Sequence, residues 1–243
     1  MNLNSCIFEF DKSFEVDFLV GTDEAGRGPA AGGVFAAAVH INNFEIAKDL
    51  AKLNDSKKLT AKVREELYDV ILNNTINSVV CVEVEDIEKY NILNCSLRAM
   101  KLSCEDVINK SQCFQEKLQG HTEFISGSQK REIPNQVQGD NTLLTIVDGN
   151  KLIKNYYYPQ QYIIKGDSKS ASIAAASILA KVTRDRYMQK LHEEYPQYNW
   201  AKNAGYLTKE HTEAIKKYGI TKYHRKSFLK NILNQKTEQL SLL

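Results

Sequence analysis

The segment from Phe18 to Ile41 reads FLVGTDEAGRGPAAGGVFAAAVHI, and it decides the fold. Its two ends, Phe18–Thr22 and Val34–Ile41, are short apolar runs with the length and composition of buried strands. The glycine-rich stretch Gly26–Gly33 lies between them and is typical of a turn region. The segment therefore predicts two neighbouring strands joined as a hairpin or near-hairpin.

Outside this segment, apolar periodicity predicts further helices and strands. One helix is expected after the capping residue Thr60, because Val63, Leu67, Val70 and Ile71 form an apolar stripe at helical spacing. Three more helices are expected at Ile92–Ile108, in an alanine-rich run from Ser170 or Ser172 to about Tyr195, and at Thr208–Tyr218. Strands are expected at Val79–Val84, Leu143–Val147 and Tyr162–Lys165. Strands first, followed by alternating strands and helices, predict an α/β fold with a mixed sheet covered by helices. Two segments lack a clear period: a polar-aromatic leader at residues 1–16, and residues 109–141, which we interpret as a polar insertion or mobile loop.

The composition excludes several classes of protein. The chain has 243 residues with 32 Lys and Arg against 30 Asp and Glu, so any nucleic-acid contact must come from local clusters of charge. Its five cysteines contain no CxxC pair, which indicates free thiols in a reducing compartment. No signal peptide is apparent, and no apolar stretch approaches the roughly 20 residues of a membrane span. We therefore expect a cytoplasmic protein that has no contact with membranes.

Four carboxylates share one feature, because each lies at or just beyond the end of a predicted strand. They are Asp23, Glu24, Asp148 and Asp167. Residues far apart in sequence converge at the carboxyl ends of strands in open α/β sheets. Two unit charges about 4 Å apart repel by roughly 4 kcal/mol at an effective dielectric near 20, so either the pKa values rise or cations bind. Oxygen-only ligands favour Mg²⁺ or Mn²⁺ over zinc, and two such ions can hydrolyse a phosphodiester.

The residues alone leave a second interpretation open. Asp148-Gly149 and Gly166-Asp167 are also common turn formers. Asp23-Glu24 could equally be a solvated end of a strand. Spacing by itself therefore does not decide between a metal site and two unrelated turns with a solvated strand end.

Five blocks of the sequence resemble the ribonuclease HII family and occur in the family's order over roughly residues 17–228. They are Gly21–Pro29 (GTDEAGRGP), Asn54–Leu59 (NDSKKL), Val147–Asn150 (VDGN), Lys165–Ser170 running into Ser172–Arg186, and Asn203–Tyr206 with Thr208–His211. The resemblance implies a ribonuclease H-like mixed β-sheet flanked by helices, with a small helical C-terminal region. The implied organisation is a catalytic domain at 17–200, a helical substrate-binding region at 201–230 and a flexible tail at 231–243.

The resemblance also implies an activity. It is an endoribonuclease that cleaves the RNA strand of RNA/DNA hybrids and DNA duplexes containing embedded ribonucleotides. Cleavage falls 5′ to the ribonucleotide by two-metal-ion hydrolysis and leaves 3′-OH and 5′-phosphate ends. Asp23, Glu24, Asp148 and Asp167 then become the catalytic residues that bind Mg²⁺ or Mn²⁺.

Substrate recognition is implied for two further blocks. Gly26, Arg27 and Gly28 match the family element whose backbone recognises the ribonucleotide 2′-OH, and Tyr206 matches a tyrosine that stacks near the following deoxyribose. The 2′-OH distinguishes RNA from DNA at one nucleotide, so a backbone contact can detect it without regard to base sequence. Taken without its block, Tyr206 would be a half-buried packing residue.

Basic residues suggest contacts with the nucleic-acid backbone. Lys57 and Lys58 precede a predicted helix start, where phosphate is favoured, and Lys165 and Lys169 flank Asp167. Six more lie near the C-terminus without acidic neighbours: Lys216, Lys217, Lys222, Arg225, Lys226 and Lys230. This cluster predicts either a duplex-binding patch or a solvated face. Arg184 and Asp185, inside the long helix, predict an internal ion pair or a direct role in the site.

The sequence also bears on two alternative assignments of the family and on one protein partner. The related ribonuclease HIII carries a large N-terminal domain and lacks the Gly-Arg-Gly element, whereas here about 16 residues precede the first strand and Arg27 is present. A non-catalytic nucleic-acid-binding module would lack a carboxylate, and all four are present. The last five residues, Gln239–Leu243 (QLSLL), resemble the peptide with which bacterial proteins dock on the replication sliding clamp.

Overall fold

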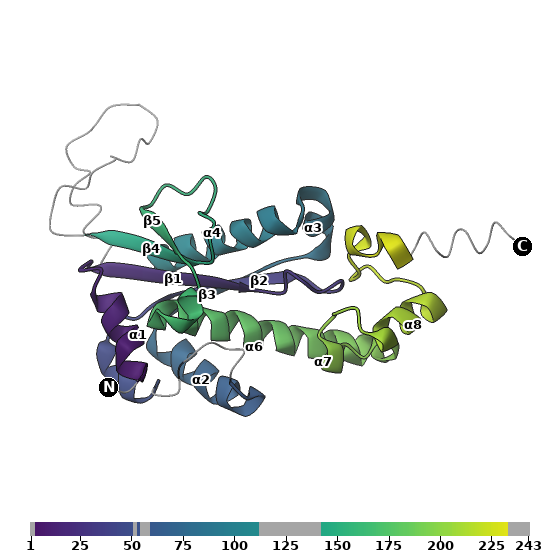
Figure 1. Cartoon of the computed structure of the whole chain (residues 1–243), viewed down its shortest axis with the longest axis horizontal. Helices are drawn as coiled ribbons and strands as arrows, with labels where there is room; N and C mark the ends of the chain where they lie inside the picture. The colour runs from purple at the N-terminus through teal and green to yellow at the C-terminus, as the bar shows by residue number, and fades with distance from the viewer. Residues whose placement is uncertain (1–2, 51–52, 54–58, 112–141, 233–243) are drawn as a thin grey trace, which may run out of the picture.

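A mixed β-sheet forms the centre of the protein (Figure 1). The computed structural model describes residues 3–50, 53, 59–111 and 142–232. Within them, the strands are β1 (Phe18–Ala25), β2 (Val34–His40), β3 (Ile76–Val82), β4 (Leu143–Asp148) and β5 (Gln160–Ile163), in the order β3-β2-β1-β4-β5. β1 pairs antiparallel with β2, which confirms the hairpin, and β2 pairs antiparallel with β3. β1 pairs parallel with β4, and β4 pairs parallel with β5.

Helices cover both faces of this sheet. The α-helices of the described residues are α1 (Leu3–Lys12), α2 (Ala61–Asn74), α3 (Val84–Tyr90), α4 (Ile92–Lys110), α6 (Ala171–Glu194), α7 (Trp200–Asn203) and α8 (Lys209–Tyr218). Short 3₁₀ turns connect them: η1 (Phe44–Lys48), η3 (Gly166–Ser168), η4 (Pro196–Tyr198) and η5 (Lys226–Phe228). α3 and α4 lie on one face, α6 with α1 and α2 on the other, and α7 and α8 lie beyond one end of the sheet (Figure 1). The predicted α/β class is confirmed.

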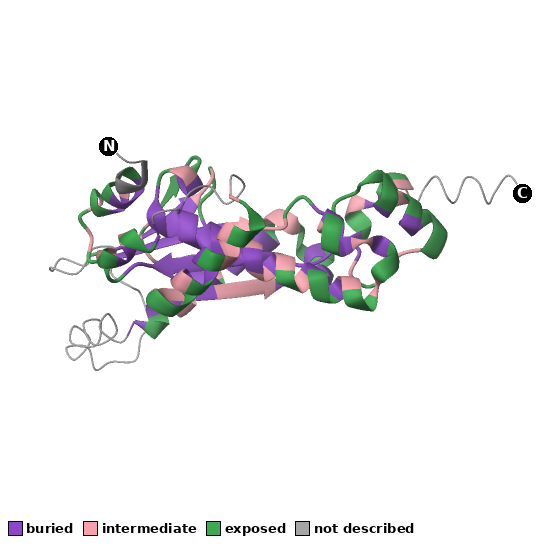
Figure 2. Ribbon diagram, turned by 90° about the horizontal axis from the view of Figure 1, so that it is seen from below, coloured by how far each residue is buried: buried purple, intermediate pink, exposed green. Residues whose placement is uncertain are grey.

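The alternation of side chains along β2 explains how it is buried from both sides. Ala36 and Ala38 contribute to the core beneath α4, whereas Ala37 and Val39 contribute to the core beneath α6. Each is fully buried. A strand covered on both faces has no polar side to alternate with, and small side chains let both helices approach closely. Figure 2 shows this buried layer continuing through the sheet and the inner side of α6.

Gly21 lets the start of α6 rest on the central strand. A Cβ at Gly21 would lie 2.5 Å from backbone atoms of Ser172 and Ile173, so a larger residue would push α6 away. Ser170 caps α6 by accepting a hydrogen bond from the Ile173 backbone N–H at 3.2 Å. This contact fixes the position of the segment immediately before α6, which contains Asp167.

Two strand boundaries differ from the prediction. β5 ends at Ile163 rather than Lys165, because Lys165 adopts a left-handed conformation with φ 57°, which a strand cannot contain. β3 begins at Ile76 and ends at Val82, and Val84 opens α3 instead of closing the strand. The predicted cap at Thr60 is confirmed, and of the two serines predicted to open α6 it is Ser170 that caps the helix. Thr208, predicted as the first residue of the last helix, is the N-cap of α8.

The two segments that lack a clear period in the sequence, residues 1–16 and 109–141, are described by the structure to different extents. The leader contains α1, whose Ile7 and Phe8 are buried against the rest of the protein. α4 continues through Lys110, and the rest of the predicted insertion, from residue 112 on, lies outside the described residues.

Two expectations from composition can be compared with the described part of the chain. Cys6, Cys81, Cys95 and Cys104 are free thiols there, as predicted. None of the helices in that part combines the length and apolar character needed to cross a bilayer.

Candidate active site

The four predicted carboxylates lie at one edge of the sheet. β1, β4 and β5 run parallel, so their carboxyl ends meet there. Asp148 is the last residue of β4, and Asp167 lies in η3, shortly after β5. Asp23 and Glu24 were predicted at or beyond the end of a strand, but β1 continues to Ala25 and includes both. The bend begins only at Gly26, whose φ is 97°.

Asp23 is a buried carboxylate whose pKa is strongly shifted by its surroundings. Only 6% of it is exposed, and its Oδ1 accepts a hydrogen bond from the Glu24 backbone N–H at 2.7 Å. Burial raises the pKa of Asp23 well above its ordinary value, and the nearby charges of Glu24 and Asp148 raise it further. A hydrogen bond with Ser177 of α6 opposes this effect. The structure therefore brings Asp23, Glu24 and Asp148 into electrostatic contact.

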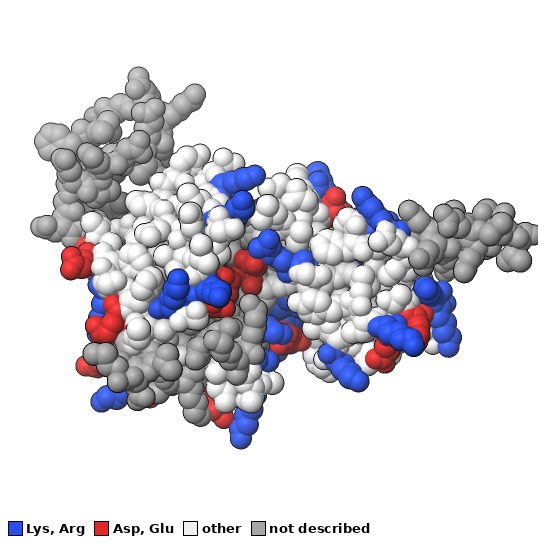
Figure 3. Space-filling model, viewed as in Figure 1, with Lys and Arg blue, Asp and Glu red and all other residues white. Residues whose placement is uncertain are grey.

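Asp148 connects this group to Asp167. Its Oδ1 accepts a hydrogen bond from the Gly166 backbone N–H at 2.7 Å, and the Asp167 N–H lies 3.4 Å from the same oxygen. Asp167 itself is 8% exposed. Figure 3 shows acidic side chains gathered near the middle of the face in view, with basic side chains on either side.

This donor set fits a hard divalent cation. Carboxylate oxygens are the ligands that Mg²⁺ and Mn²⁺ prefer, and a cation would offset the repulsion that raises the pKa of Asp23. Within the described residues, no three His, Cys, Asp or Glu side chains are already grouped closely enough to hold a metal ion. The carboxylates are thus neighbours, but their oxygens do not form a closed cage.

Arg225 holds the segment Gly26–Gly33, here called the glycine loop. Its guanidinium donates to five backbone carbonyl oxygens of the loop at 2.8–3.2 Å, those of Gly26, Arg27, Pro29, Gly32 and Gly33. These bonds use all five N–H donors of an arginine. Arg225 is fully buried, and burial lowers its pKa to about 10, so it stays charged at neutral pH.

This arrangement corrects part of the predicted duplex-binding patch. Arg225 cannot contact DNA, because the glycine loop surrounds it. Composition cannot distinguish such an arginine from exposed neighbours. A physical signal did exist in the sequence, since a glycine-rich loop leaves backbone carbonyls that need donors. The other five basic residues are exposed: Lys216, Lys217, Lys222, Lys226 and Lys230.

Arg184 is a second buried arginine that connects the glycine loop to the C-terminal region. It donates to the carbonyl oxygens of Ala31 at 3.3 Å and Ala204 at 3.0 Å. Asp185 pairs with Lys181 of the same helix and not with Arg184, so of the two alternatives the Arg184–Asp185 ion pair is wrong. Gly26 makes room for Arg184, because a Cβ there would lie 2.2 Å from the guanidinium Nε.

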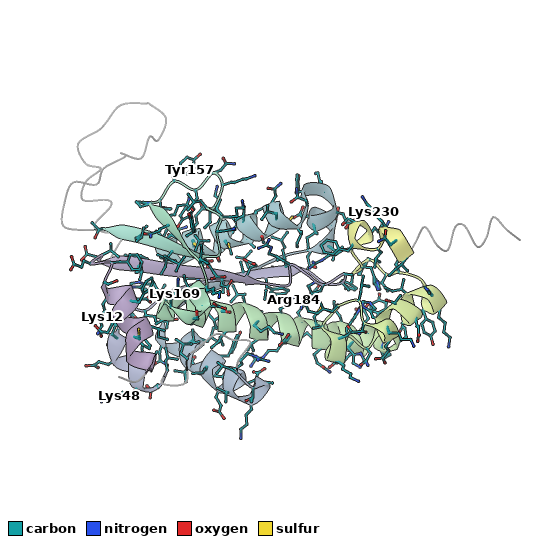
Figure 4. The ribbon with its side chains drawn as sticks, in the orientation of Figure 1. Lys12, Lys48, Tyr157, Lys169, Arg184 and Lys230 are labelled. Carbon is teal, nitrogen blue, oxygen red and sulfur yellow. The ribbon has the colours of Figure 1, made fainter. Side chains whose placement is uncertain are left out.

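The glycine loop also positions the residues predicted to contact substrate. A Cβ at Gly28 would lie 3.3 Å from the ring of Tyr206, which is 53% exposed, so the ring lies beside the loop and open to solvent. Arg27 is half exposed and pairs with Glu24 at 3.2 Å. Lys169 is exposed at the start of α6, and Arg184 lies farther along the same helix (Figure 4). Lys57 and Lys58 lie outside the described residues.

Comparison with known proteins now identifies the family. The family model described as Ribonuclease HII matches residues 20–231. The chain belongs to the ribonuclease HII family. It is 45% identical to ribonuclease HII of Fusobacterium nucleatum over 91% of this chain and 90% of that protein. It is 41% identical to the Rickettsia bellii enzyme over 92% and 96% of the two chains.

Solved structures agree on the fold. The ribonuclease H2 of Pyrococcus horikoshii has a TM-score of 0.64 at 23% identity, covering 90% of this chain and 98% of that one. The ribonuclease HII of Archaeoglobus fulgidus, solved in complex with PCNA, has a TM-score of 0.57 at 22% identity over 86% and 93%. The ribonuclease H-like fold is therefore confirmed, and family membership makes the chain a ribonuclease H, a hydrolase with endonuclease function.

Proposed function

We propose that the chain cleaves the ribonucleotide-containing strand of RNA/DNA hybrids and of DNA duplexes with embedded ribonucleotides, 5′ to the ribonucleotide. The observation that carries this proposal is that the four carboxylates lie at the edge of the sheet beside the glycine loop. Asp23 and Glu24 lie in the last three residues of β1, and the loop whose backbone Arg225 fixes begins two residues after Glu24. Two of the four carboxylates and the loop proposed to recognise the sugar thus belong to one continuous segment.

Asp23, Glu24, Asp148 and Asp167 are proposed as the residues that hold two Mg²⁺ or Mn²⁺ ions. When bound, such ions activate a water molecule and stabilise the leaving oxygen of a phosphodiester. The Gly166 N–H holds Asp148 in place through its Oδ1, which leaves the second oxygen for a ligand. Burial of Asp23 keeps this part of the site away from bulk water and strengthens its electrostatic interactions.

Recognition is assigned to the glycine loop and Tyr206. Gly26, Arg27 and Gly28 present backbone groups to the 2′-OH, and the half-exposed Tyr206 ring stacks on the adjoining deoxyribose. Lys57, Lys58 and Lys169 contact phosphates, together with the five exposed lysines near the C-terminus. A site built from backbone atoms and sugar contacts recognises the junction and not the base sequence.

End-mapping of the products tests this function. A DNA duplex with one ribonucleotide, an RNA/DNA hybrid and an all-DNA duplex are incubated with the enzyme and Mg²⁺ or Mn²⁺. We expect cutting 5′ to the ribonucleotide with 3′-OH and 5′-phosphate ends, and no cutting of the all-DNA duplex. Cutting of all-DNA at a comparable rate, or ends of the opposite polarity, would refute the proposal.

The sequence Gln239–Leu243 supports a second proposal, that the chain docks on a replication sliding clamp. These residues lie outside the described part of the structure. An extended peptide can place three leucines in apolar pockets, each contributing about 1.5–3 kcal/mol before the cost of ordering the chain. We expect affinity near micromolar, about −8 kcal/mol. Calorimetric titration of clamp with the full chain and with a version lacking residues 239–243 tests this, and equal binding by both, or by neither, contradicts it.

A further inference from the structure

Two buried histidines lie between Tyr206 and the glycine loop. His211, on α8, is fully buried, and His224, 2% exposed, directly precedes Arg225. Their Nε2 atoms are 3.2 Å apart. His211 Nδ1 lies 2.9 Å from the Tyr206 carbonyl oxygen, and His224 forms an antiparallel bridge with Ala31 of the glycine loop. The pair thus connects the two elements proposed to recognise the sugar.

The surrounding donors determine which ring nitrogen carries each proton. The Trp200 indole N–H, which can only donate, points to His211 Nε2 at 3.1 Å, so the proton of His211 lies on Nδ1 and is donated to the Tyr206 carbonyl. The Thr221 backbone N–H donates to His224 Nδ1 at 2.9 Å, so the proton of His224 lies on Nε2 and points to His211. This chain of hydrogen bonds is satisfied only when both imidazoles are neutral.

The environment of the pair favours this neutral state. Burial lowers the pKa of His211. Burial, together with the proximity of His211, lowers the pKa of His224 to about 4. The rings of Tyr198 and Trp200 lie 4.8 and 5.2 Å from the His224 ring, centroid to centroid, so aromatic surface covers it. A fully satisfied, water-poor polar network of this kind rigidifies the segments that it joins.

We propose that His211 and His224 are positioning residues for cleavage at an RNA–DNA junction, because they hold the Tyr206 backbone at a fixed place relative to Gly28. The Tyr206 ring and the backbone of the glycine loop then reach the same nucleotide. Neither histidine touches the carboxylates or the substrate, and His211 acts through Tyr206. The inference rests on the proposed function, because it requires Tyr206 to contact the substrate.

Two substitutions at His211 separate its hydrogen bonds. In His211→Asn, the amide nitrogen takes the place of Nδ1 and still donates to the Tyr206 carbonyl. In His211→Gln, the amide oxygen reaches the place of Nε2 and accepts from Trp200, but the Tyr206 carbonyl loses one of its two donors and keeps the Thr208 backbone N–H at 2.8 Å. On a duplex with one ribonucleotide, we expect His211→Gln to lower kcat/KM by about threefold to tenfold and His211→Asn to lower it less. Cleavage of an all-RNA hybrid should change little in either variant.

A double-mutant cycle with Tyr206→Ala shows whether His211 acts through Tyr206. Once the ring is absent, His211→Gln should have no further effect on junction cleavage. If His211→Gln slows both backgrounds, or both substrates, by the same factor, the positioning role is refuted while the proposed function stands. If Tyr206→Ala itself leaves junction cleavage unchanged, the role of Tyr206 fails and the inference fails with it.

Nitrogen-15 NMR of the histidine rings gives a test on the unsubstituted protein. At pH 7 we expect His211 neutral with its proton on Nδ1 and His224 neutral with its proton on Nε2. A doubly protonated ring, or the opposite tautomer at either position, overturns the inference.

Discussion

At the scale of single residues, Arg225 shows how a charge can serve structure alone. Its five N–H groups all donate to backbone carbonyls of the glycine loop, and no carboxylate takes part in these bonds. The loop contains few side chains that could hold its shape, so its conformation depends on this guanidinium. The proposed recognition of the sugar by this loop therefore depends on a residue almost 200 positions away in sequence.

Replacing Arg225 with Lys tests this dependence. Lysine has three donors where arginine has five, so at least two carbonyls lose their partner. We expect Arg225→Lys to lower the free energy of unfolding by about 2–5 kcal/mol, measured by urea denaturation. Lys226→Ala, at the adjacent exposed position, should change it by no more than about 0.5 kcal/mol. Equal losses in the two variants would contradict the bracing role.

Tyr206 is expected to act on substrate rather than on stability. Because its ring is 53% exposed, Tyr206→Ala should unfold at nearly the native urea concentration. Loss of a stacking contact, worth about 1–3 kcal/mol for an aromatic ring on a base, should lower cleavage at a single ribonucleotide by about tenfold or more. Steady-state kinetics on that substrate measure the effect, and a native rate would show that Tyr206 is a surface packing residue.

The residue types at the site could be predicted from the sequence, whereas their partners could not. Asp148 and Asp167 were singled out because acidic residues followed predicted strands, and the parallel sheet brings them together. Burial of Arg225 depends on which distant carbonyls lie around it, and that depends on the tertiary fold. The same holds for His211 and His224, which sequence analysis left without a role.

At the scale of elements, α1 docks on the start of α6 through one buried carboxylate. Asp11 is 3% exposed, and its Oδ2 accepts a hydrogen bond from the Ser172 backbone N–H at 2.8 Å. The amino end of a helix favours negative charge, but burial outweighs this and raises the pKa of Asp11 to about 6. The ionised form is therefore disfavoured in the folded state.

This gives a stability that falls as the pH rises. The unfolded Asp11 titrates near 3.8 and the folded one near 6, so the contribution is fully present below about pH 4 and is lost as the pH passes 6. The loss amounts to roughly 3 kcal/mol at most. In Asp11→Asn we expect this component to be absent, so the variant gains stability relative to the native protein between pH 4 and pH 7.

Urea denaturation of both proteins across that range measures the difference. Glu9→Gln serves as the control, because it removes an exposed carboxylate from the same helix. Its stability should follow the native curve. Parallel curves for native and Asp11→Asn would show that folding does not raise the pKa of Asp11.

Elements with strong local signals were predicted well, and those that depend on tertiary contacts were not. α2 has both a capping residue and a periodic apolar stripe, so its start followed from Thr60. The start of α6 was narrowed to Ser170 or Ser172, and α8 was expected to begin at Thr208, which is its N-cap. α1 is short and rich in aromatic residues without a clear period, and its helix is visible only through contacts of Ile7 and Phe8 with the core. The predicted end of β5 was wrong because Lys165 has a left-handed backbone conformation, and a non-glycine residue gives no clear sequence signal for that conformation.

At the scale of the whole molecule, the C-terminal helices and the catalytic sheet form one framework around the site. Ala30 donates to the Gly205 carbonyl at 2.9 Å, and Gly32 donates to the Tyr223 carbonyl at 2.9 Å. Arg184 crosses between the same two regions. The predicted boundary near residue 200 therefore falls between two parts of the chain that both contact the glycine loop.

The proposed reaction requires Asp23, Glu24, Asp148 and Asp167 to hold divalent cations where the strand is cut at a ribonucleotide. The most direct measurement is the single-turnover rate on a duplex with one ribonucleotide, with Mg²⁺, with Mn²⁺ and with EDTA, for the native chain, Asp148→Asn and Asp167→Asn. Asparagine keeps the shape of each side chain and, at Asp148, the oxygen that accepts from Gly166, so both variants should stay folded. We expect no cleavage in EDTA, and we expect the single-turnover rate of each variant to fall by at least about a hundredfold. Native rates in EDTA, or in either folded variant, would contradict it.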